Sequence, residues 1–546
     1  MRVLLVWPKF ESFSFWNFEK VCELIGVRYM TPPLGLLTVA ALLPREWDLR
    51  VVDENVQMLE ERDFEGVDLV VLSSKIVHRL RALAVIRMAR ARGLPVAVGG
   101  PDPTLTPQPY LDAGATHLCR GEGEITIPRL LEDLRRGVPE AIYDARKELA
   151  DLTQSPPPRF DLIDHRNYMY VGVQYSRGCP YNCEFCNVID IFEHKYRTKT
   201  LAQVLSELDL VYSLGYRGQL DFFDDNLAGD MKAVKPFLRG IADWMRDHKY
   251  PFHLSTSITL NIAKDPELLD LLREARFKYL LVGIETPDAQ ALKRAQKPHN
   301  VGYSISEACD IIYRRAGATV HSGFLLGLDG EAPDIADQIC KCVDESAIPW
   351  VMAGVVFPLP GTQLARRLER EGRLFEIARD ERVLEVARDQ ISAGLMFQPE
   401  RPPKDVLRDL VRVMHHAFEP AGYFARCGEV ASRLGTVPNL MPGFRIFLRN
   451  ARTFLRLCVR MTRSSETRRP FWKALWKVVW KNSAGVEALA TLSVLYLHFQ
   501  AMLPYCYEQL ALQRKELDDL GEEAWLEKKL GAPPQPKLRV VADARA

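Results

Sequence analysis

The 546-residue chain has almost no net charge, which limits what it can attract over long distances. Lys and Arg total 72 against 71 Asp and Glu, a formal net charge of +1. No global positive field recruits nucleic acid, so we expect no nucleic-acid partner. The first residues also lack a basic segment and a small-residue cleavage site, which argues against a signal peptide. We therefore expect a cytoplasmic protein in which eight scattered cysteines of the eleven are reduced and mostly buried.

The first 150 residues lack a dinucleotide motif but alternate strands with helices. Five apolar runs predict buried parallel strands: 2–8, 49–56, 67–74, 95–101 and 116–124. Helical spacing between them, as over residues 35–44, predicts a doubly wound, Rossmann-like α/β sheet. The first strand runs into Trp7 and Pro8 without the glycines of G-x-G-x-x-G. We therefore do not expect a dinucleotide ligand.

Small residues follow three of these predicted strands. Ligands of doubly wound sheets bind at the carboxyl ends of the strands, where small side chains let the backbone approach a large flat ligand. Ordinary turns favour the same residue types, so the two interpretations stay open. The residues are Ser73, Ser74, Gly99, Gly100, Gly121 and Gly123.

A second series of β/α units follows a linker over residues 151–165. Six apolar runs predict its strands: 171–176, 219–226, 252–258, 279–285, 319–327 and 350–358. Helices between them, including 303–316 and 333–346, predict an open, parallel partial (β/α)6 barrel over residues 166–395. The loops after its strands should build an active site, as they do in complete β/α barrels.

Three cysteines follow the first barrel strand, and no fourth lies nearby. Cys179, Cys183 and Cys186 have the spacing C-x3-C-x2-C. Three thiolates can hold a [4Fe–4S] cluster with one iron left open to a small molecule that carries an amine and a carboxylate. Zinc is the rival metal, since His194 could complete a tetrahedral set. Cysteines with only a packing role are the third alternative, and we favour the cluster.

The cysteine loop resembles the signature of the radical S-adenosylmethionine (SAM) superfamily. The spacing and the aromatic residue before the last cysteine carry this resemblance. It implies that SAM fills the open iron, that reduction cleaves SAM to a 5′-deoxyadenosyl radical, and that an electron donor such as flavodoxin or ferredoxin is needed. The family usually has Gly-Gly-Glu after the second strand, where this chain has Asp-Asp-Asn. The resemblance implies SAM-binding roles for Phe185, Asp224, Asp225, Asn226 and Glu285.

The first domain resembles a cobalamin-binding domain. That family places Ser-x-Leu after one strand and Gly-Gly after the next, which Ser74 matches loosely and Gly99-Gly100 match well. The family's Asp-x-His-x-x-Gly motif is absent, because no histidine precedes His78. The resemblance therefore implies that cobalamin binds through the residues given above, with no protein histidine on its lower face.

A cobalamin-like domain before a radical SAM barrel resembles the cobalamin-dependent radical SAM enzymes. The subgroup that includes the hopanoid methylases shares the cysteine run, the Arg-Thr-Lys-Thr that follows at 197–200, and a long C-terminal extension. The resemblance implies a methyltransferase that modifies an unactivated carbon of a lipid or natural product by way of methylcobalamin. Two alternatives remain: a related enzyme for cyclisation, ring contraction or rearrangement without methyl transfer, and a cobalamin or iron–sulfur sensor. No catalytic residue is singled out.

Residues 396–546 predict a helical C-terminal domain. Residues 445–481 are rich in Arg and Lys, contain Glu466 as their only acid, and repeat tryptophan at Trp472, Trp476 and Trp480. Such a helix could lie on the inner face of a membrane, but we favour tryptophans packed on the barrel. The apolar run 488–505 is short for a membrane span and predicts a buried helix. His415 and His416 are interpreted as surface or core residues rather than ligands.

Overall fold

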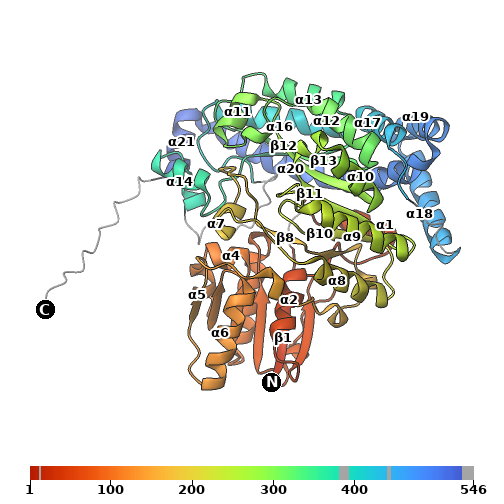
Figure 1. Ribbon diagram of the computed structural model, residues 1–546. Coiled ribbons are helices and arrows are strands. Elements are labelled where there is room, and N and C mark those ends of the chain that lie inside the picture. The colour runs from red at the N-terminus through yellow and green to blue at the C-terminus, as the bar shows by residue number, and fades with distance from the viewer. Residues whose placement is uncertain (11–13, 380–392, 439–443, 532–546) are drawn as a thin grey trace.

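The computed structural model describes residues 1–10, 14–379, 393–438 and 444–531. The N-terminal sheet lies below the barrel in Figure 1, and the C-terminal helices cover the top of the barrel and one of its sides. The carboxyl ends of the N-terminal strands point toward the barrel. The three parts therefore meet around one central region.

The N-terminal sheet is parallel throughout, with the strand order β2-β1-β3-β4-β5-β6. Its strands are β1 (Arg2–Trp7), β2 (Asp48–Asp53), β3 (Leu69–Ser73), β4 (Val96–Gly99), β5 (His117–Arg120) and β6 (Ile142–Asp144). The doubly wound sheet predicted from the sequence is confirmed. The short strand β6 was not predicted.

Alternation along β1 shows why this sheet is covered on both faces. Leu4 and Val6 enter one core, whereas Val3 and Leu5 enter the other. The covering helices are α2 (Leu34–Leu42), α3 (Arg79–Arg90), α4 (Pro101–Leu105), α5 (Gln108–Asp112) and α6 (Gly123–Arg136). Helices α3 and α5 supply one core and α2 and α6 the other.

The second sheet is the predicted six-stranded partial barrel, also parallel, in the order β14-β13-β12-β11-β10-β7. Its strands are β7 (Tyr170–Val173), β10 (Gln219–Phe222), β11 (His253–Ile258), β12 (Phe277–Glu285), β13 (Thr319–Leu326) and β14 (Trp350–Val355). The intervening helices are α7 (Val188–Phe192), α8 (Leu201–Ser213), α9 (Val234–Asp247), α10 (Pro266–Glu274), α11 (Ala289–Arg294), α12 (Ile305–Ile311) and α13 (Ile335–Glu345). No pairing of β7 with β14 occurs among the described residues, so the barrel is open.

Local sequence signals explain where two barrel helices begin. The side chain of Asp265 accepts a hydrogen bond from the backbone N–H of Leu268 and caps α10, with Pro266 in its first turn. Thr200, the last residue of the Arg-Thr-Lys-Thr run, forms a capping box with Gln203 at the start of α8. The last residue of the run 197–200 is therefore the N-cap of α8.

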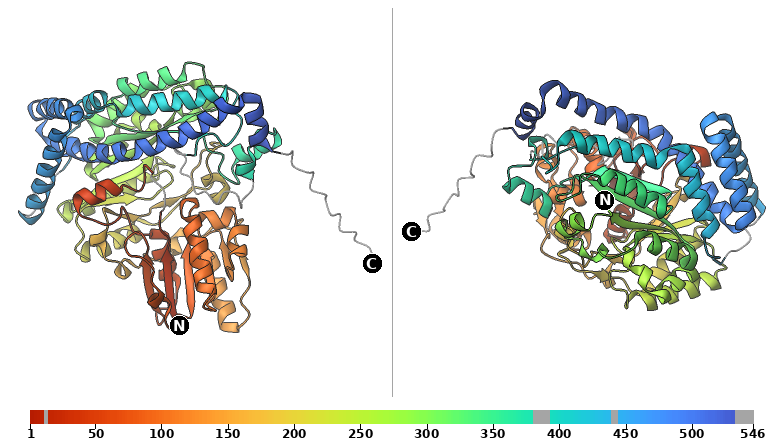
Figure 2. Two further views of the ribbon diagram at one scale, coloured as in Figure 1. Left: turned by 180° about the vertical axis from the view of Figure 1, so that it is seen from behind. Right: turned by 90° about the horizontal axis from the view of Figure 1, so that it is seen from above.

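Two helices, α14 (Gln363–Arg370) and α15 (Glu376–Arg379), follow β14 within the range predicted for the barrel. The C-terminal region is helical, as predicted, and its helices are α16 (Pro403–Phe418), α17 (Pro420–Arg433), α18 (Phe444–Arg463), α19 (Ser465–Lys481), α20 (Val486–Leu520) and α21 (Glu522–Leu530). Figure 2 shows α16 and α20 running side by side over the barrel. His415 is exposed and His416 pairs with Asp344 at 2.9 Å, which agrees with the surface interpretation of this pair.

Among the described residues, one helical stretch, Ser483–Leu520, is long and apolar enough to cross a membrane. Of its apolar window, 56% is buried inside the protein, and a core helix passes the same test. This is weak evidence for a span. The helix α20 extends well beyond the apolar run 488–505, and that run contains buried core residues such as Leu492 and Phe499, as expected.

The interpretation favoured for the tryptophans of residues 445–481 is wrong for two of them. Trp476 is 58% exposed and Trp480 is 83% exposed. The face of α19 that packs on α17 consists instead of Phe471, Leu475 and Val478. Trp476 and Trp480 are four residues apart, which places both on one side of α19, away from the side formed by Phe471, Leu475 and Val478.

Gly100 offers a test of how closely the loops after β3 and β4 approach each other. Its φ of 107° and ψ of 177° lie in a region that only glycine populates readily. A Cβ atom there would lie 2.6 Å from the backbone oxygen of Ser74. We expect Gly100→Ala to lower the free energy of unfolding by about 2–4 kcal/mol.

Urea titration followed by circular dichroism measures this loss. Gly137→Ala is the matched control, because Gly137 also has a positive φ, 72°, but a Cβ atom added there would have no neighbour within 4 Å. This control should lose only about 1 kcal/mol. Equal losses in the two variants would contradict a close approach at Gly100.

Candidate functional site

A cavity of about 2000 Å³ lies where the three parts of the chain meet. Ligand pockets commonly measure about 300–1000 Å³, so this space can hold more than one ligand. Its walls come from the carboxyl ends of the N-terminal strands, the inside of the barrel, and helices α18 and α20. The cavity therefore connects all three regions.

Five of the six small residues predicted to contact cobalamin line this cavity. They are Ser73, Gly99, Gly100, Gly121 and Gly123. The sixth, Ser74, is fully buried beneath it. Its hydroxyl donates to the backbone oxygen of Lys75 at 3.1 Å and accepts from the hydroxyl of Tyr110 at 2.8 Å. The structure thus gives Ser74 a packing environment, while the other five face the space where a large ligand fits.

Two residues that the sequence analysis did not assign also line this wall. The side chain of Lys75 enters the cavity, with its amine 5.9 Å from the ring centroid of Trp7. The ring of His78 lies edge-on to Trp7, with 4.5 Å between centroids. Burial lowers the pKa of His78 to about 3, so this imidazole is neutral at physiological pH. Both residues come directly after β3, at the carboxyl end where doubly wound sheets bind their ligands. This position in the sequence could have identified them.

A short antiparallel ribbon closes the base of the cysteine loop. Strand β8 (Ser176–Arg177) pairs with β9 (Arg197–Thr198), so the chain between them forms a closed loop. Lys199, next to the ribbon, forms a buried ion pair with Glu207 at 2.5 Å. The run 197–200 therefore fixes the ribbon to the barrel.

Asp224 and Asp225 hold the start of this loop from the neighbouring strand end. One carboxylate oxygen of Asp224 accepts hydrogen bonds from the backbone N–H groups of Tyr175 and Ser176, at 2.9 and 2.8 Å. Burial raises the pKa of Asp224 to about 8. Asp225 accepts from the N–H of Gly178 at 2.8 Å and, unlike Asp224, lines the cavity. Adjacent carboxylates therefore occupy different environments.

The three cysteines are free thiols on this loop. Burial, with a smaller contribution from neighbouring cysteine thiolates, raises the pKa of Cys183 to about 11 and that of Cys186 to about 12. These groups need a positive partner in order to ionise, which an iron–sulfur cluster provides. Among the described residues, no group of three or more His, Cys, Asp or Glu side chains is already arranged as a metal site. His194, the fourth ligand of the alternative zinc site, is exposed.

Asn226, Glu285 and Lys297 surround the cysteines. The amide nitrogen of Asn226 lies 3.9 Å from the sulfur of Cys179, and its buried amide oxygen has no partner among the described residues. Glu285 ends β12 with a φ of 68°, a conformation that non-glycine residues rarely adopt. It accepts a hydrogen bond from the amine of Lys297 at 2.6 Å. The charge of Lys297 lowers the pKa of Cys183, against the larger effect of burial. The sequence analysis did not identify Lys297.

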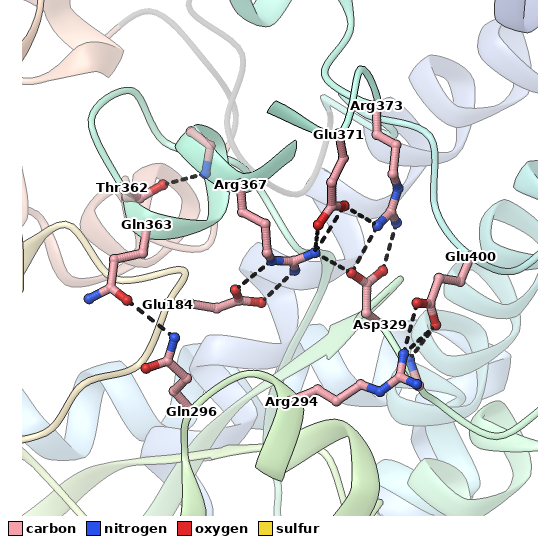
Figure 3. A network of polar contacts seen from close by, with 12 residues as sticks. Glu184, Arg294, Gln296, Asp329, Thr362, Gln363, Arg367, Glu371, Arg373 and Glu400 are labelled. Carbon is pink, nitrogen blue, oxygen red and sulfur yellow. Dashed lines mark hydrogen bonds and ion pairs between the residues drawn. The ribbon is translucent and has the colours of Figure 1, made fainter. Parts of the chain in front are cut away.

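The middle of the cysteine loop is anchored to α14 (Figure 3). Glu184 receives two hydrogen bonds from the guanidinium of Arg367, at 2.8 and 3.0 Å. Arg367 also pairs with Asp329 at 2.7 Å, and Arg373 pairs with the same carboxylate. Charge-assisted bonds of this bidentate kind are directional, so they restrict the loop in orientation as well as position.

A second set of ion pairs joins the cysteine loop to the N-terminal domain. Arg177 pairs with Glu122 at 2.9 Å and with Glu124 at 2.6 Å, and Arg197 pairs with Glu122 at 2.7 Å. All four side chains are at most 17% exposed. The glutamates alternate with Gly121 and Gly123 at the junction of β5 and α6, where Gly123 and Glu124 already belong to the first turn of α6. The same junction therefore lines the cavity and holds the base of the cysteine loop.

We expect Arg177→Met to destabilise the contact between the two domains. It would leave Glu124 largely buried with no cation at hydrogen-bond distance, and breaking a buried pair costs about 3–5 kcal/mol. Burial alone would raise the pKa of Glu124, but Arg177 lowers it to about 2. The stabilisation is therefore present above pH 4.5 and is lost as the pH falls toward 2.

Urea unfolding of wild type and variant between pH 7 and pH 3 measures both effects. Arg129→Met is the matched control, because Arg129 pairs with Glu148 on the surface, where a pair is worth less than about 1 kcal/mol. An Arg177→Met protein that is as stable as the control at pH 7 would contradict this role.

We expect Arg367→Leu to release Glu184 and lower the amount of cluster that the cysteine loop retains. Iron content and absorbance per protein after anaerobic reconstitution measure this effect, and the loss should be severalfold. Arg370→Leu is the control, since Arg370 is exposed on the same helix and, among the described residues, donates only to the backbone oxygen of Arg366. Equal iron retention in both variants would show that the anchor is dispensable.

Comparison with known protein families agrees with the three regions of the structure. Residues 24–131 match the B12 binding domain, residues 173–342 match the radical SAM superfamily, and residues 362–511 match a domain of unknown function, DUF4070. The first two matches coincide with the N-terminal sheet and with the barrel that carries the cysteines.

Relatives match over most of the chain. An uncharacterized methyltransferase of Synechocystis sp. is 37% identical over 500 residues, 91% of this chain and 91% of the relative. The hopanoid C-2 methylase of Rhodopseudomonas palustris is 38% identical over 378 residues, 68% of this chain and 71% of that enzyme.

Solved structures share the fold at low sequence identity. The radical SAM methyltransferase TsrM from Kitasatospora setae, solved with cobalamin and a [4Fe–4S] cluster, superposes with a TM-score of 0.56 at 16% identity, over 81% of this chain and 92% of that one. The cobalamin-dependent SAM radical enzyme OxsB superposes with a TM-score of 0.59 at 13% identity, over 97% and 83%. With the family matches and the relatives above, these observations show that the chain is an enzyme of the cobalamin-dependent radical SAM methyltransferase family, whose cofactors are cobalamin, SAM and a [4Fe–4S] cluster.

Proposed function

We propose that this enzyme transfers a methyl group to an unactivated carbon of an apolar small molecule, a lipid or a natural product. The observation that carries the proposal is the continuous cavity described above. It runs from the strand ends that carry Gly99 and Gly121 past Asp225 to the interior of the barrel. Cys179, Cys183 and Cys186 are not among the lining residues, but Asp225 on the cavity wall accepts from the N–H of Gly178, next to Cys179. A substrate in that space would therefore lie beside both proposed cofactor sites.

The residues around the cavity suit the cofactors that the family uses. We assign Cys179, Cys183 and Cys186 to the cluster, because they are free thiols on an anchored loop. SAM would contact the cluster beside Asn226, whose unpartnered amide oxygen is available to accept from an amine. We also assign Phe185, Asp225 and Glu285 to SAM: Asp225 lines the cavity, Glu285 accepts from Lys297, and Phe185, next to Cys186, packs against the main hydrophobic core. Asp224 would act through the backbone of Tyr175 and Ser176 that it binds.

The N-terminal wall suits a large flat ligand. Gly99, Gly100, Gly121 and Gly123 leave the strand ends without bulky side chains, and Ser73 adds one hydroxyl. We therefore assign these five residues to cobalamin and place Ser74 beneath them.

When bound, the cluster and SAM supply a 5′-deoxyadenosyl radical, and cobalamin supplies the methyl group. The chain's own contribution is to position the substrate and exclude water. Tyr279, Leu281 and Trp350 line the barrel interior. At the level of Tyr279, on the two adjacent strands, Asp221 accepts a hydrogen bond from Ser255 at 2.6 Å, and burial raises the pKa of Asp221 to about 6. This polar pair in a mainly apolar wall can orient one polar group of the substrate.

The proposal includes an electron donor such as flavodoxin or ferredoxin, because the cluster must be reduced before SAM is cleaved. It also includes a cytoplasmic location with peripheral contact at the inner face of the membrane. Residues 445–481 support that contact.

Two measurements test the proposal with the reconstituted enzyme. Each of Cys179→Ala, Cys183→Ala and Cys186→Ala should lose 5′-deoxyadenosine formation from SAM, because two thiolates do not hold the cluster with one open iron. Cys340→Ala is the control, since Cys340 is a partly buried free thiol outside the loop. Formation of 5′-deoxyadenosine by the triple variant would rule out radical SAM chemistry here.

The second measurement follows the methyl group. Wild-type enzyme supplied with methyl-deuterated SAM and a lipid extract should give a product that carries the label. A product of unchanged mass, formed while SAM is cleaved, would show cyclisation or rearrangement in place of methyl transfer.

A further inference from the structure

Helix α18 separates the cavity from the surface of the protein. Residues Asn450, Ala451, Thr453, Phe454 and Leu457 line the cavity. Leu448, Leu455 and Val459 are exposed by 38, 65 and 43%. Their spacing of seven and four residues places them in one stripe, on the side of the helix away from Phe454 and Leu457. One helix thus has a cavity-lining face and an exposed apolar stripe.

Helix α19 repeats this arrangement beside α18. Phe471, Leu475 and Val478 are buried on one side, and Trp476 and Trp480 are exposed on the other. Figure 2 shows the two helices next to each other at one edge of the molecule, and the indole nitrogen of Trp472 donates to Thr462 of α18 at 3.0 Å. Large exposed aromatic side chains are unusual on a protein surface and mark interaction sites.

Basic residues flank both apolar stripes. Those that are exposed and form no ion pair with a described residue are Arg452, Arg456, Arg460, Arg463, Arg468, Arg469, Lys473 and Lys481. Lys477, in contrast, pairs with Glu429. Within residues 445–481, the single acidic residue is Glu466. The outer faces of α18 and α19 therefore combine exposed tryptophan and leucine side chains with an excess of positive charge.

We propose that the outer faces of α18 and α19 form a docking surface for an anionic lipid bilayer. Tryptophan and leucine would enter the boundary between headgroups and acyl chains, and the arginines and lysines would contact the headgroup phosphates. Because the inner face of α18 lines the cavity, docking places that end of the cavity next to the bilayer, from which an apolar substrate enters. The docking on a bilayer does not depend on the proposed function. Only the entry of substrate from the bilayer rests on that function.

Flotation with lipid vesicles tests the docking. Full-length wild-type protein should float with vesicles of phosphatidylglycerol and phosphatidylcholine at low salt, and far less with phosphatidylcholine alone. Binding should fall steeply as salt is raised, because salt screens charges beyond about 10 Å at 0.1 M. Brominated lipids should quench part of the tryptophan fluorescence.

Two sets of substitutions locate the surface. Arg469→Glu, Lys473→Glu and Lys481→Glu together should lower the partition coefficient about 100-fold or more, since each basic residue near the membrane contributes about fivefold. Trp476→Ala with Trp480→Ala should remove the quenching by brominated lipids. Circular dichroism and thermal unfolding establish that both variants remain folded.

The control reverses the same number of charges elsewhere. Lys147→Glu, Lys232→Glu and Lys341→Glu change exposed lysines outside α18 and α19 and should leave flotation unchanged. Wild-type protein that stays with the buffer at every salt concentration would overturn the proposal, as would charge and tryptophan variants that float like wild type. Formation of 5′-deoxyadenosine by the same preparations reports separately on the proposed chemistry.

Discussion

The buried ion pairs between Arg177, Arg197, Glu122 and Glu124 are the contact on which the rest of the site depends. Charges removed from water must be paired, so these four groups are compatible with only a narrow range of domain positions. They join the β5–α6 junction, which carries Gly121 and Gly123, to the two strands that close the cysteine loop. Arg177, Glu122 and Glu124 also line the cavity, so these pairs connect two of its walls.

The cysteine loop has little regular structure of its own, and its neighbours determine its shape. Asp225 holds its first residue, the ribbon of β8 and β9 closes its base, and Arg367 holds Glu184 between two of the cysteines. These contacts come from three different strand ends or helices. A loop held in this way keeps its thiols in place before the cofactor binds, which is how a protein scaffold preorganises a reactive site.

The C-terminal helices belong to the site as much as the two preceding domains do. Helix α20 supplies core residues such as Phe499 and also lines the cavity with Val494 and Thr491. Helix α18 closes the same space on another side. The size and apolar character of the substrate space therefore depend on the C-terminal helices as well as on the two preceding domains.

The sequence by itself determined the features that depend on neighbouring residues. Apolar runs separated by helical segments predicted eleven of the strands in the two sheets. The spacing of Cys179, Cys183 and Cys186 indicated a cluster with an open iron. Such signals are local, because strand burial and metal ligation depend on residues a few positions apart. The short β6 escaped prediction because three residues carry too weak a pattern.

Tertiary structure alone decided which partners distant residues find. Arg177 and Glu122 lie 55 positions apart, and no local pattern relates them. Asp224 and Asp225 are adjacent, yet only Asp225 faces the cavity, because the direction of each side chain depends on how β10 meets the cysteine loop. Likewise, the composition of α19 predicts an amphipathic helix, but its packing on α17 determines that Trp476 and Trp480 face outward. Contacts between distant segments form only in the folded chain, and this is why the sequence alone could not supply them.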